Sequence, residues 1–113
     1  MGSEVIQSRQ DFFRVLDEAI AQISDRVRKQ PKFQAYLDLE LQLDKMWRWT
    51  RDGRTPTDEE RHSTDLGVIA IREIEPVETS EDQRFVTNLH ELDYYFENWP
   101  DDPEVAAEDP PLE

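Results

Sequence analysis

The stretch Ser80 to Trp99, which reads SEDQRFVTNLHELDYYFENW, decides the fold class of this 113-residue chain. Its main apolar residues are spaced by four, three, four and three positions: Phe85, Leu89, Leu92, Phe96 and Trp99. This spacing places them on one face of an α-helix, and that face must be buried against other elements. Ser80 and Gln83 have the spacing of a capping box, so the helix is expected to begin there.

A second helix is predicted near the N-terminus. Ser8 and Asp11 have capping-box spacing, with Asp in place of the usual Glu. The apolar residues that follow keep a helical period: Phe12, Leu16, Ala19, Ile20, Ile23 and Val27. The pair Gln30-Pro31 ends this helix, because proline disfavours helical geometry in the residue before it and suits the first turn of a new helix.

The next helix is expected to start near Pro31 and to stop around Asp52-Gly53. Its apolar side chains cover more than one stripe, as in a helix packed on two sides: Phe33, Tyr36, Leu37, Leu41, Leu43, Met46 and Trp47. Thr57 to Glu60 has the pattern of another capping box. The stretch Leu66 to Ile74 has strand propensity, but a lone strand would leave its backbone hydrogen bonds unmade. We interpret it as a helix that ends at Glu75-Pro76.

These patterns predict an all-α protein, a compact bundle of about four helices with a disordered acidic C-terminal tail. Residues 8–99 are expected to form the helical domain, and residues 1–7 an N-terminal extension. Beyond Trp99 the chain is rich in Pro, Glu and Ala and has almost no apolar content. Residues 100–113 are therefore expected to be the acidic, Pro-rich tail.

The composition excludes several classes of protein. The chain has no cysteine, which excludes disulfides, thiolate zinc sites and thiol nucleophiles and suits a reducing compartment. Its longest apolar run is far shorter than the roughly 20 residues of a membrane helix. The N-terminus has no long hydrophobic region of the kind found in secretory signals. The sequence predicts a cytoplasmic protein that does not enter a membrane.

The charge is large and unevenly distributed. The chain carries 27 acidic and 13 basic residues, a net charge of −14. Residues 1–72 hold 13 acids and 12 bases, whereas residues 73–113 hold 14 acids and a single base, Arg84. Such a field repels nucleic acid phosphates and steers a basic protein toward one end of the molecule.

The sequence offers no recognisable reaction centre. His62 and His90 sit in no ligand pattern, and His90 with Asp93 one turn later falls short of the three or four ligands that a metal site needs. The segment Asp52-Gly53-Arg54 lacks the alternating acids of a calcium loop, and three scattered glycines build no phosphate loop. Acids this numerous usually form a solvated face. We predict no metal, no cofactor and no enzymatic activity.

Aromatic residues give a sharper signal for binding. Trp47 and Trp49 lie two positions apart on one predicted helix, so they point to different faces and one is expected to be exposed. Trp49 either closes over the helix end or anchors a partner, because tryptophan is enriched at binding hot spots. Of Tyr94 and Tyr95, at least one is expected to face outward.

Three strings together resemble a known family: PKFQAYLDLELQL at 31–43, LGVIAIRE at 66–73, and the pair Tyr94-Tyr95. They are similar to the small helical immunity proteins that protect type VI secreting bacteria from their own NAD(P)-hydrolysing effector. The resemblance covers roughly residues 13–95. It implies an all-helical cytoplasmic protein that binds the effector's toxin domain one-to-one and blocks its active site, without cofactor or catalysis.

The sequence departs from that pattern in the loop Asp52 to Thr64 and in its acidic C-terminal extension. The toxin is therefore either NAD(P)-hydrolysing or another nucleotide-directed enzyme, such as an alarmone synthetase. Two other classes stay open: an acidic DNA mimic that inhibits a nucleic-acid-binding protein, and an adaptor that holds a partner without inhibiting it. Contact residues are expected on the outward side of the last helix and its exit, or on the tryptophan-bearing helix: Asp93, Tyr94, Glu97, Trp99, Asp101, Asp102, Trp47, Arg48 and Trp49.

Overall fold

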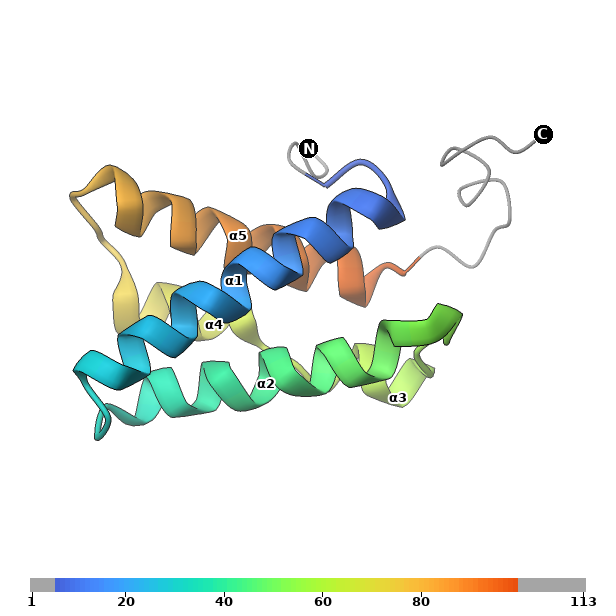
Figure 1. Cartoon of the computed structure of the whole chain (residues 1–113), viewed down its shortest axis with the longest axis horizontal. Helices are drawn as coiled ribbons and strands as arrows, with labels where there is room; N and C mark the ends of the chain where they lie inside the picture. Colours follow the sequence, from blue (N-terminus) through green and yellow to red (C-terminus); the bar gives the residue numbers. More distant parts are fainter. Residues whose placement is uncertain (1–5, 100–113) are drawn as a thin grey trace.

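The computed structural model of the chain describes residues 6–99, and all regular structure in that range is helical (Figure 1). Its elements are α1 (Arg9–Lys29), α2 (Gln34–Thr50), the 3₁₀ turn η1 (Arg51–Gly53), α3 (Asp58–Arg61), α4 (Leu66–Ile69), the π-helical turn η2 (Ala70–Ile74) and α5 (Ser80–Glu97). The prediction of an all-α bundle is confirmed. The predicted tail, residues 100–113, lies outside the described residues.

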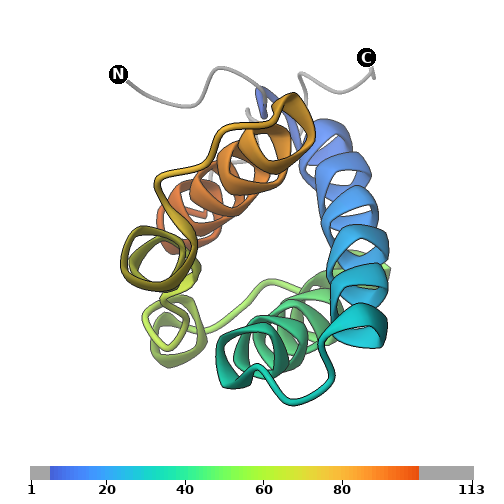
Figure 2. The same cartoon turned by 90° about the vertical axis from the view of Figure 1, so that its left-hand side faces the viewer.

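The main helices close into a ring around one core (Figure 2). Helix α1 packs against α2 on one side and α5 on the other, and α4 packs against both α2 and α5. Each helix turns its apolar stripe inward, so the middle of the ring is filled with side chains. The largest fully buried residues are Phe12, Leu16, Ile23, Leu39, Leu43, Met46, Leu66, Phe85, Leu89, Leu92 and Phe96, together with Ile6.

Two of the predicted helix starts are confirmed. The Ser8 hydroxyl accepts a hydrogen bond from the Asp11 backbone N–H at 3.1 Å, which caps α1. Before α3, the Glu60 N–H donates to the Thr57 hydroxyl at 3.1 Å, and the Thr57 N–H donates to the Glu60 carboxylate at 3.0 Å. All three bonds satisfy backbone donors at a helix start.

The predicted start of α2 is wrong by one turn. The helix begins at Gln34, because Pro31 belongs to a tight turn in which the Phe33 N–H donates to the Gln30 carbonyl at 3.2 Å. This turn reverses the chain so that α2 runs back along α1. The prediction that α2 packs on two sides is confirmed, since it contacts both α1 and α4.

The predicted cap of α5 is also wrong, by one residue. Thr79, not Ser80, has the extended backbone of an N-cap, and its side chain accepts from the Asp82 N–H at 3.0 Å. Ser80 is already the first helical residue. Both pairs have the same spacing, so sequence alone did not separate them. The Asp82 side chain also pairs with Arg26 of α1, which favours this register.

The ambiguous stretch from Leu66 to Ile74 is helical, as predicted. Leu66, Ile69 and Ala70 face the core, whereas Val68 and Ile71 are 44% and 60% exposed. The last turn widens into a π-helix, in which the Glu75 N–H donates to the Ala70 carbonyl at 2.8 Å. Strand propensity was overridden because a helix places three apolar side chains in the core and makes its own backbone bonds.

An aromatic cluster seals the core at the carboxyl end of α5. The Phe12 ring stacks on Tyr95 at 5.3 Å between centroids, and Trp99 packs edge-on against Phe12 at 5.1 Å. The Arg9 guanidinium lies over the Trp99 ring at 4.7 Å. Trp99 is therefore only 3% exposed, and the prediction that it lies on the outward side of the helix exit is wrong.

Candidate partner-binding face

Asp93 joins α5 to the start of α4. Its carboxylate accepts hydrogen bonds from the Gly67 backbone N–H at 3.0 Å and from the Thr64 hydroxyl at 3.3 Å. The Asp65 side chain at the N-cap of α4 does not cap the helix, so Asp93 supplies an acceptor for an N-terminal N–H from another helix. The prediction that Asp93 faces outward for a partner is wrong, because the side chain is half-buried and occupied by these contacts.

Burial raises the pKa of the Asp93 carboxyl above its ordinary value, although the hydrogen bonds from Gly67 and Thr64 oppose this rise. The negative charges of Glu97 and Asp65 add to it. The carboxyl therefore stands in a negative local field. Of these two charges, Glu97 belongs to the acid-rich segment 73–113 and Asp65 precedes it.

Gly67 lets α4 and α5 approach closely. A Cβ atom at this position would lie 3.0 Å from Nδ1 of His90 and 3.2 Å from Oδ2 of Asp93. On the other side of the same contact, Nε2 of His90 lies 2.7 Å from the Glu75 carboxylate. His90 is thus placed as a link between α5 and the end of η2, and α4, η2 and α5 form one continuous surface.

Exposed apolar residues occur on all three of these elements. Three large hydrophobic side chains of α4, η2 and α5 point to solvent: Val68, Ile71 and Tyr94, which is 51% exposed. The exposed acids Glu73 and Glu97 lie on the same elements. We call these five residues the α4–α5 face. Apolar side chains rimmed by charge are typical of a surface that binds another protein.

The charge of this half of the described chain is strongly negative. Residues 65–99 carry nine acids and two bases, whereas residues 6–64 carry eleven of each. One of the two bases, Arg84, is paired with Glu18 of α1. The other, Arg72, is exposed on η2 beside Ile71. The surplus of acids still gives this segment a net negative charge, which attracts a basic surface.

Of the other residues predicted to contact a partner, some are exposed and some lie outside the described residues. Tyr94 and Glu97 are exposed on α5, and the prediction that one of the two tyrosines faces outward is confirmed, since Tyr95 is buried. Arg48 is exposed and pairs with Asp44 at 2.9 Å. Asp101 and Asp102 lie outside the described residues.

The two tryptophans of α2 point to different neighbours, as predicted. Trp49 stacks on Phe96 of α5 with centroids 6.2 Å apart, which is the reading in which it closes over the helix end. Trp47 lies beneath the Arg51 guanidinium at 4.1 Å and shares a hollow with Phe13 of α1. Both rings are half-buried, so the prediction that one of them is exposed is wrong.

Val68 and Ile71 were missed as candidate contacts. The stretch that holds them contains more apolar residues than one helical stripe needs, and this excess was read as strand propensity. Once α4 and η2 are helical, Leu66, Ile69 and Ala70 use the core side and the surplus is exposed. The excess was the signal that could have found them.

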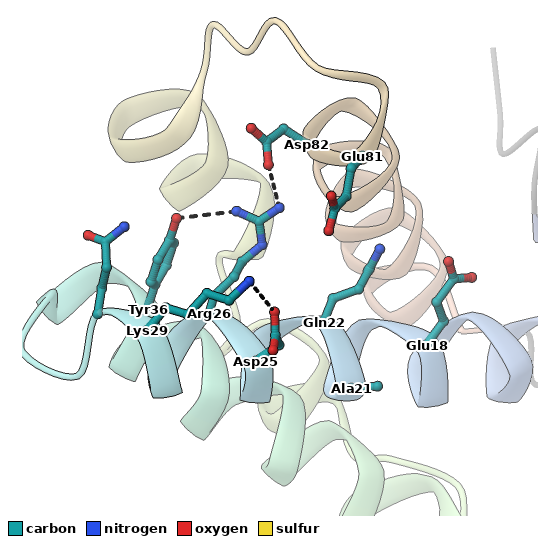
Figure 3. Close-up of a pocket in the computed structure, with 10 residues that line it drawn as sticks. Glu18, Ala21, Gln22, Asp25, Arg26, Lys29, Tyr36, Glu81 and Asp82 are labelled. Carbon is teal, nitrogen blue, oxygen red and sulfur yellow. Dashed lines mark hydrogen bonds and ion pairs between the residues drawn. The ribbon is translucent and has the colours of Figure 1, made fainter.

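A polar groove lies between α1 and the start of α5 (Figure 3). Arg26 crosses it, donating to the Tyr36 hydroxyl at 3.3 Å and pairing with Asp82. The Arg26 guanidinium also lies 4.3 Å from the Phe85 ring centre. This ion pair lowers the pKa of the Asp82 carboxyl. Arg26 ties three helices together, and its role is structural.

Neighbouring charges in this groove are also paired. Lys29 lies 3.1 Å from the Asp25 carboxylate, as Figure 3 shows, and Arg84 hydrogen-bonds to Glu18 and lowers the pKa of that carboxyl. Such exposed pairs contribute little individually. In residues 6–99, no group of three or more His, Cys, Asp or Glu side chains is placed to hold a metal ion. None of the helices in this range is long and apolar enough to cross a membrane.

The fold and the face together define a small all-helical protein with an acidic, partly apolar surface suited to binding another protein. Comparison with protein families gives the class: the Tsi6 family model matches residues 13–98. The chain belongs to the Tsi6 family, a family of type VI secretion immunity proteins. Searches of curated proteins and of solved structures found no match.

Proposed function

We propose that this protein neutralises one cognate type VI secreted toxin by binding its toxin domain through the α4–α5 face and covering the active site. The observation that carries the proposal is that exposed apolar side chains and a surplus of acidic residues lie in the same segment of the chain. Val68, Ile71 and Tyr94 are exposed there, and the same segment of the chain holds nine acids against two bases. Family membership supplies the class of partner.

Electrostatic complementarity explains how such a face would inhibit. A toxin that acts on an anionic nucleotide, whether it hydrolyses NAD(P) or makes an alarmone, needs a basic cleft for the phosphates. Carboxylates such as Glu73 and Glu97 offer that cleft negative charge in place of phosphate. The neighbouring apolar side chains then add affinity by leaving water.

Protection by this mechanism is stoichiometric, with one immunity protein for each toxin and no catalytic turnover or cofactor. It takes place in the cytoplasm, where the toxin would meet its nucleotide. Free toxin must be kept scarce, so the affinity is expected to be nanomolar or tighter, equivalent to at least about 12 kcal/mol. An interface of ordinary size with aromatic anchors reaches this range.

The first test is a titration of the purified toxin encoded beside this gene, with NAD and ATP levels followed in cells that express it. Toxin activity should reach zero at one equivalent of this protein, and the nucleotide that is depleted identifies the toxin class. Inhibition complete far below one equivalent would mean turnover. A partner that is bound but stays active would make the protein an adaptor, and competition with DNA for the partner would support a DNA mimic.

The second test separates the two sides of the molecule. Ile71→Arg puts a positive charge at a 60% exposed position on the α4–α5 face, so stability should change by no more than about 0.5 kcal/mol. Toxin binding should weaken by roughly 30-fold or more, the loss typical of an interface hot spot. Leu41→Arg, at a 53% exposed position on α2, is the matched control and should bind normally. Equal binding by both variants would place the interface elsewhere.

A further inference from the structure

Arg72, in the middle of the π-helical turn η2, carries a positive charge that no described residue neutralises. Among residues 6–99, every other arginine either forms an ion pair with a carboxylate or, as Arg9 does, lies over an aromatic ring. Arg72 is exposed and has neither contact. Its guanidinium is therefore available to bind a group on another molecule.

Acidic side chains border Arg72 without pairing with it. Arg72 lines a hollow between η2 and the start of α2, together with Glu73 and Asp38. Within the described part of the chain neither carboxylate forms an ion pair with Arg72, and the Asp38 carboxylate instead accepts from the Gln34 side-chain amide at 3.0 Å. Pairing with a neighbouring acid would be the simplest way for Arg72 to stabilise the fold. Its free state indicates that stability does not explain this residue.

The charge of Arg72 also works against the attraction that the acids provide. Residues 65–99 hold nine acids and two bases, and the second base, Arg84, is bound to Glu18 of α1. Arg72 is thus the one unpaired cation that a basic partner meets on this segment. A neutral residue in its place would make the segment attract basic surfaces more strongly. General attraction therefore does not explain Arg72 either.

Arg72 stands among the exposed apolar residues of the α4–α5 face. It follows Ile71 directly and lies four positions after Val68, and residues four apart on a helix are neighbours. When a partner covers these side chains, water leaves the guanidinium as well, and an ion pair formed there is stronger than one in open solvent. Arginine and tyrosine are enriched at binding hot spots, and this face offers Arg72 and Tyr94.

We propose that Arg72 selects the cognate toxin by forming a two-point ion pair with one aspartate or glutamate of the toxin domain. The inference rests on the proposed function, since the toxin must bind the α4–α5 face. A planar guanidinium offers two parallel N–H groups that match a carboxylate. A basic protein that brings a lysine or arginine to this point is repelled. The acids attract basic surfaces in general, and Arg72 favours the surface that has a carboxylate in the right place.

Rate constants for the purified toxin domain, measured by stopped-flow mixing at about 150 mM salt, distinguish this role from that of a solvated charge. Arg72→Gln should speed dissociation by roughly 10- to 100-fold, because a charge-assisted pair is lost. Association should be as fast as in the wild type or faster, because the face becomes more negative. Arg72→Lys keeps the charge without the planar fork, so it should associate normally and still dissociate about 3- to 10-fold faster.

Arg28→Gln is the matched control. Arg28 is exposed on the α1–α2 hairpin, residues 9–53, and α1 lies across the ring from α4 (Figure 2). This variant changes the net charge by the same amount and should leave the dissociation rate unchanged. Arg72 has no contact within the described chain to lose, so its variants should melt like the wild type.

A charge exchange identifies the toxin carboxylate. Arg72→Glu should weaken binding by about 100-fold or more, and changing one toxin aspartate or glutamate to arginine, tested one at a time, should restore at least about tenfold of that loss. Dissociation of folded Arg72→Gln at the wild-type rate would overturn the inference, as would the absence of any rescue. If Ile71→Arg still weakens binding in the same assay, the α4–α5 face remains the interface and only the role of Arg72 is wrong. Normal binding by both variants would reject the face itself.

Discussion

The two sides of the ring use their charges in opposite ways. On the α1–α2 hairpin, acids and bases pair within a helix, as in Lys29 with Asp25 at 3.1 Å and Arg48 with Asp44 at 2.9 Å. Little net field is left there. On the α4–α5 side, residues 65–99 hold nine acids and only two bases, so most of the acids have no base nearby in the sequence. The difference indicates that the second side is kept for a partner that brings the positive charge.

This arrangement lowers stability locally. Burial is the main cause that raises the pKa of the Asp93 carboxyl, and the charges of Glu97 and Asp65 add to it, so all three oppose its ionisation in the folded protein. A chain under pressure for stability alone would place a cation beside such a carboxyl. The repulsion kept at Asp93 is consistent with a surface shaped by binding.

The largest expected effect compares neighbouring residues on α1, one in the core and one at its edge. Phe12 is fully buried and Phe13 is half-buried. Phe12→Ala should lower the free energy of unfolding by about 3–5 kcal/mol, because it leaves a cavity in the core. Phe13→Ala should lower it by less, about 2 kcal/mol, because that ring lies at the edge of the core and part of it contacts solvent. Urea unfolding monitored by circular dichroism measures both.

Equal losses for the two alanine variants would mean that Phe13 is part of the monomer core. Native domains have a free energy of unfolding of only about 5–15 kcal/mol, so the Phe12→Ala variant is expected to be partly unfolded at room temperature.

The next effect concerns the junction of α4 and α5. Asp93→Ala removes the acceptor of the Gly67 N–H and should cost about 1–3 kcal/mol, the penalty of a buried donor left unpaired. Asp93→Asn keeps an acceptor oxygen and removes the charge. At neutral pH it should be at least as stable as the wild type. Thermal unfolding of the three proteins at pH 7 measures the order.

The pH dependence follows from the direction of the shift. Because the pKa of the Asp93 carboxyl is raised in the folded state, its contribution to stability is fully present below the unfolded-state value of about 3.9. That contribution is lost as the pH rises through the folded-state pKa. The stability difference between Asp93→Asn and the wild type should therefore grow from acid to neutral pH. A difference that does not change with pH would mean that the carboxyl ionises as it does in the unfolded chain.

Much of the fold could be predicted because helical period is a local property. The spacing of Phe85, Leu89, Leu92 and Phe96 determines which side of α5 is buried, and all four are fully buried. The start of α5 was harder to predict, because Thr79 and Ser80 are equivalent candidates for its N-cap. The contact between Asp82 and the distant residue Arg26 favours Thr79. That contact joins residues 56 positions apart, which no local pattern contains.

The candidate site was harder to predict because exposure depends on neighbouring helices. Asp93 reads as a surface acid until α4 places the Gly67 N–H against it. Trp99 was expected to lie outward at the end of the last helix, but Arg9 and Phe12 cover its ring. The exposure of Tyr94 was predicted correctly, because its position opposite the apolar stripe of α5 follows from the helix alone. Its contact with a partner stays a prediction.

The smallest expected effect concerns the rate at which the toxin is captured. If the α4–α5 side steers a basic partner, raising the salt from low concentration to about 0.5 M should slow association by about tenfold and change dissociation much less, because screening acts on the encounter. Glu97→Gln removes one exposed charge from the α4–α5 face and should reduce both the on-rate and its salt dependence. Asp44→Asn, which removes a charge already paired with Arg48 on the hairpin, should leave both unchanged. Stopped-flow mixing with labelled toxin domain measures these rates. An on-rate that is indifferent to salt, or equally sensitive to both variants, would show that the acidic side does not guide the encounter and that the contrast between the two sides has another origin.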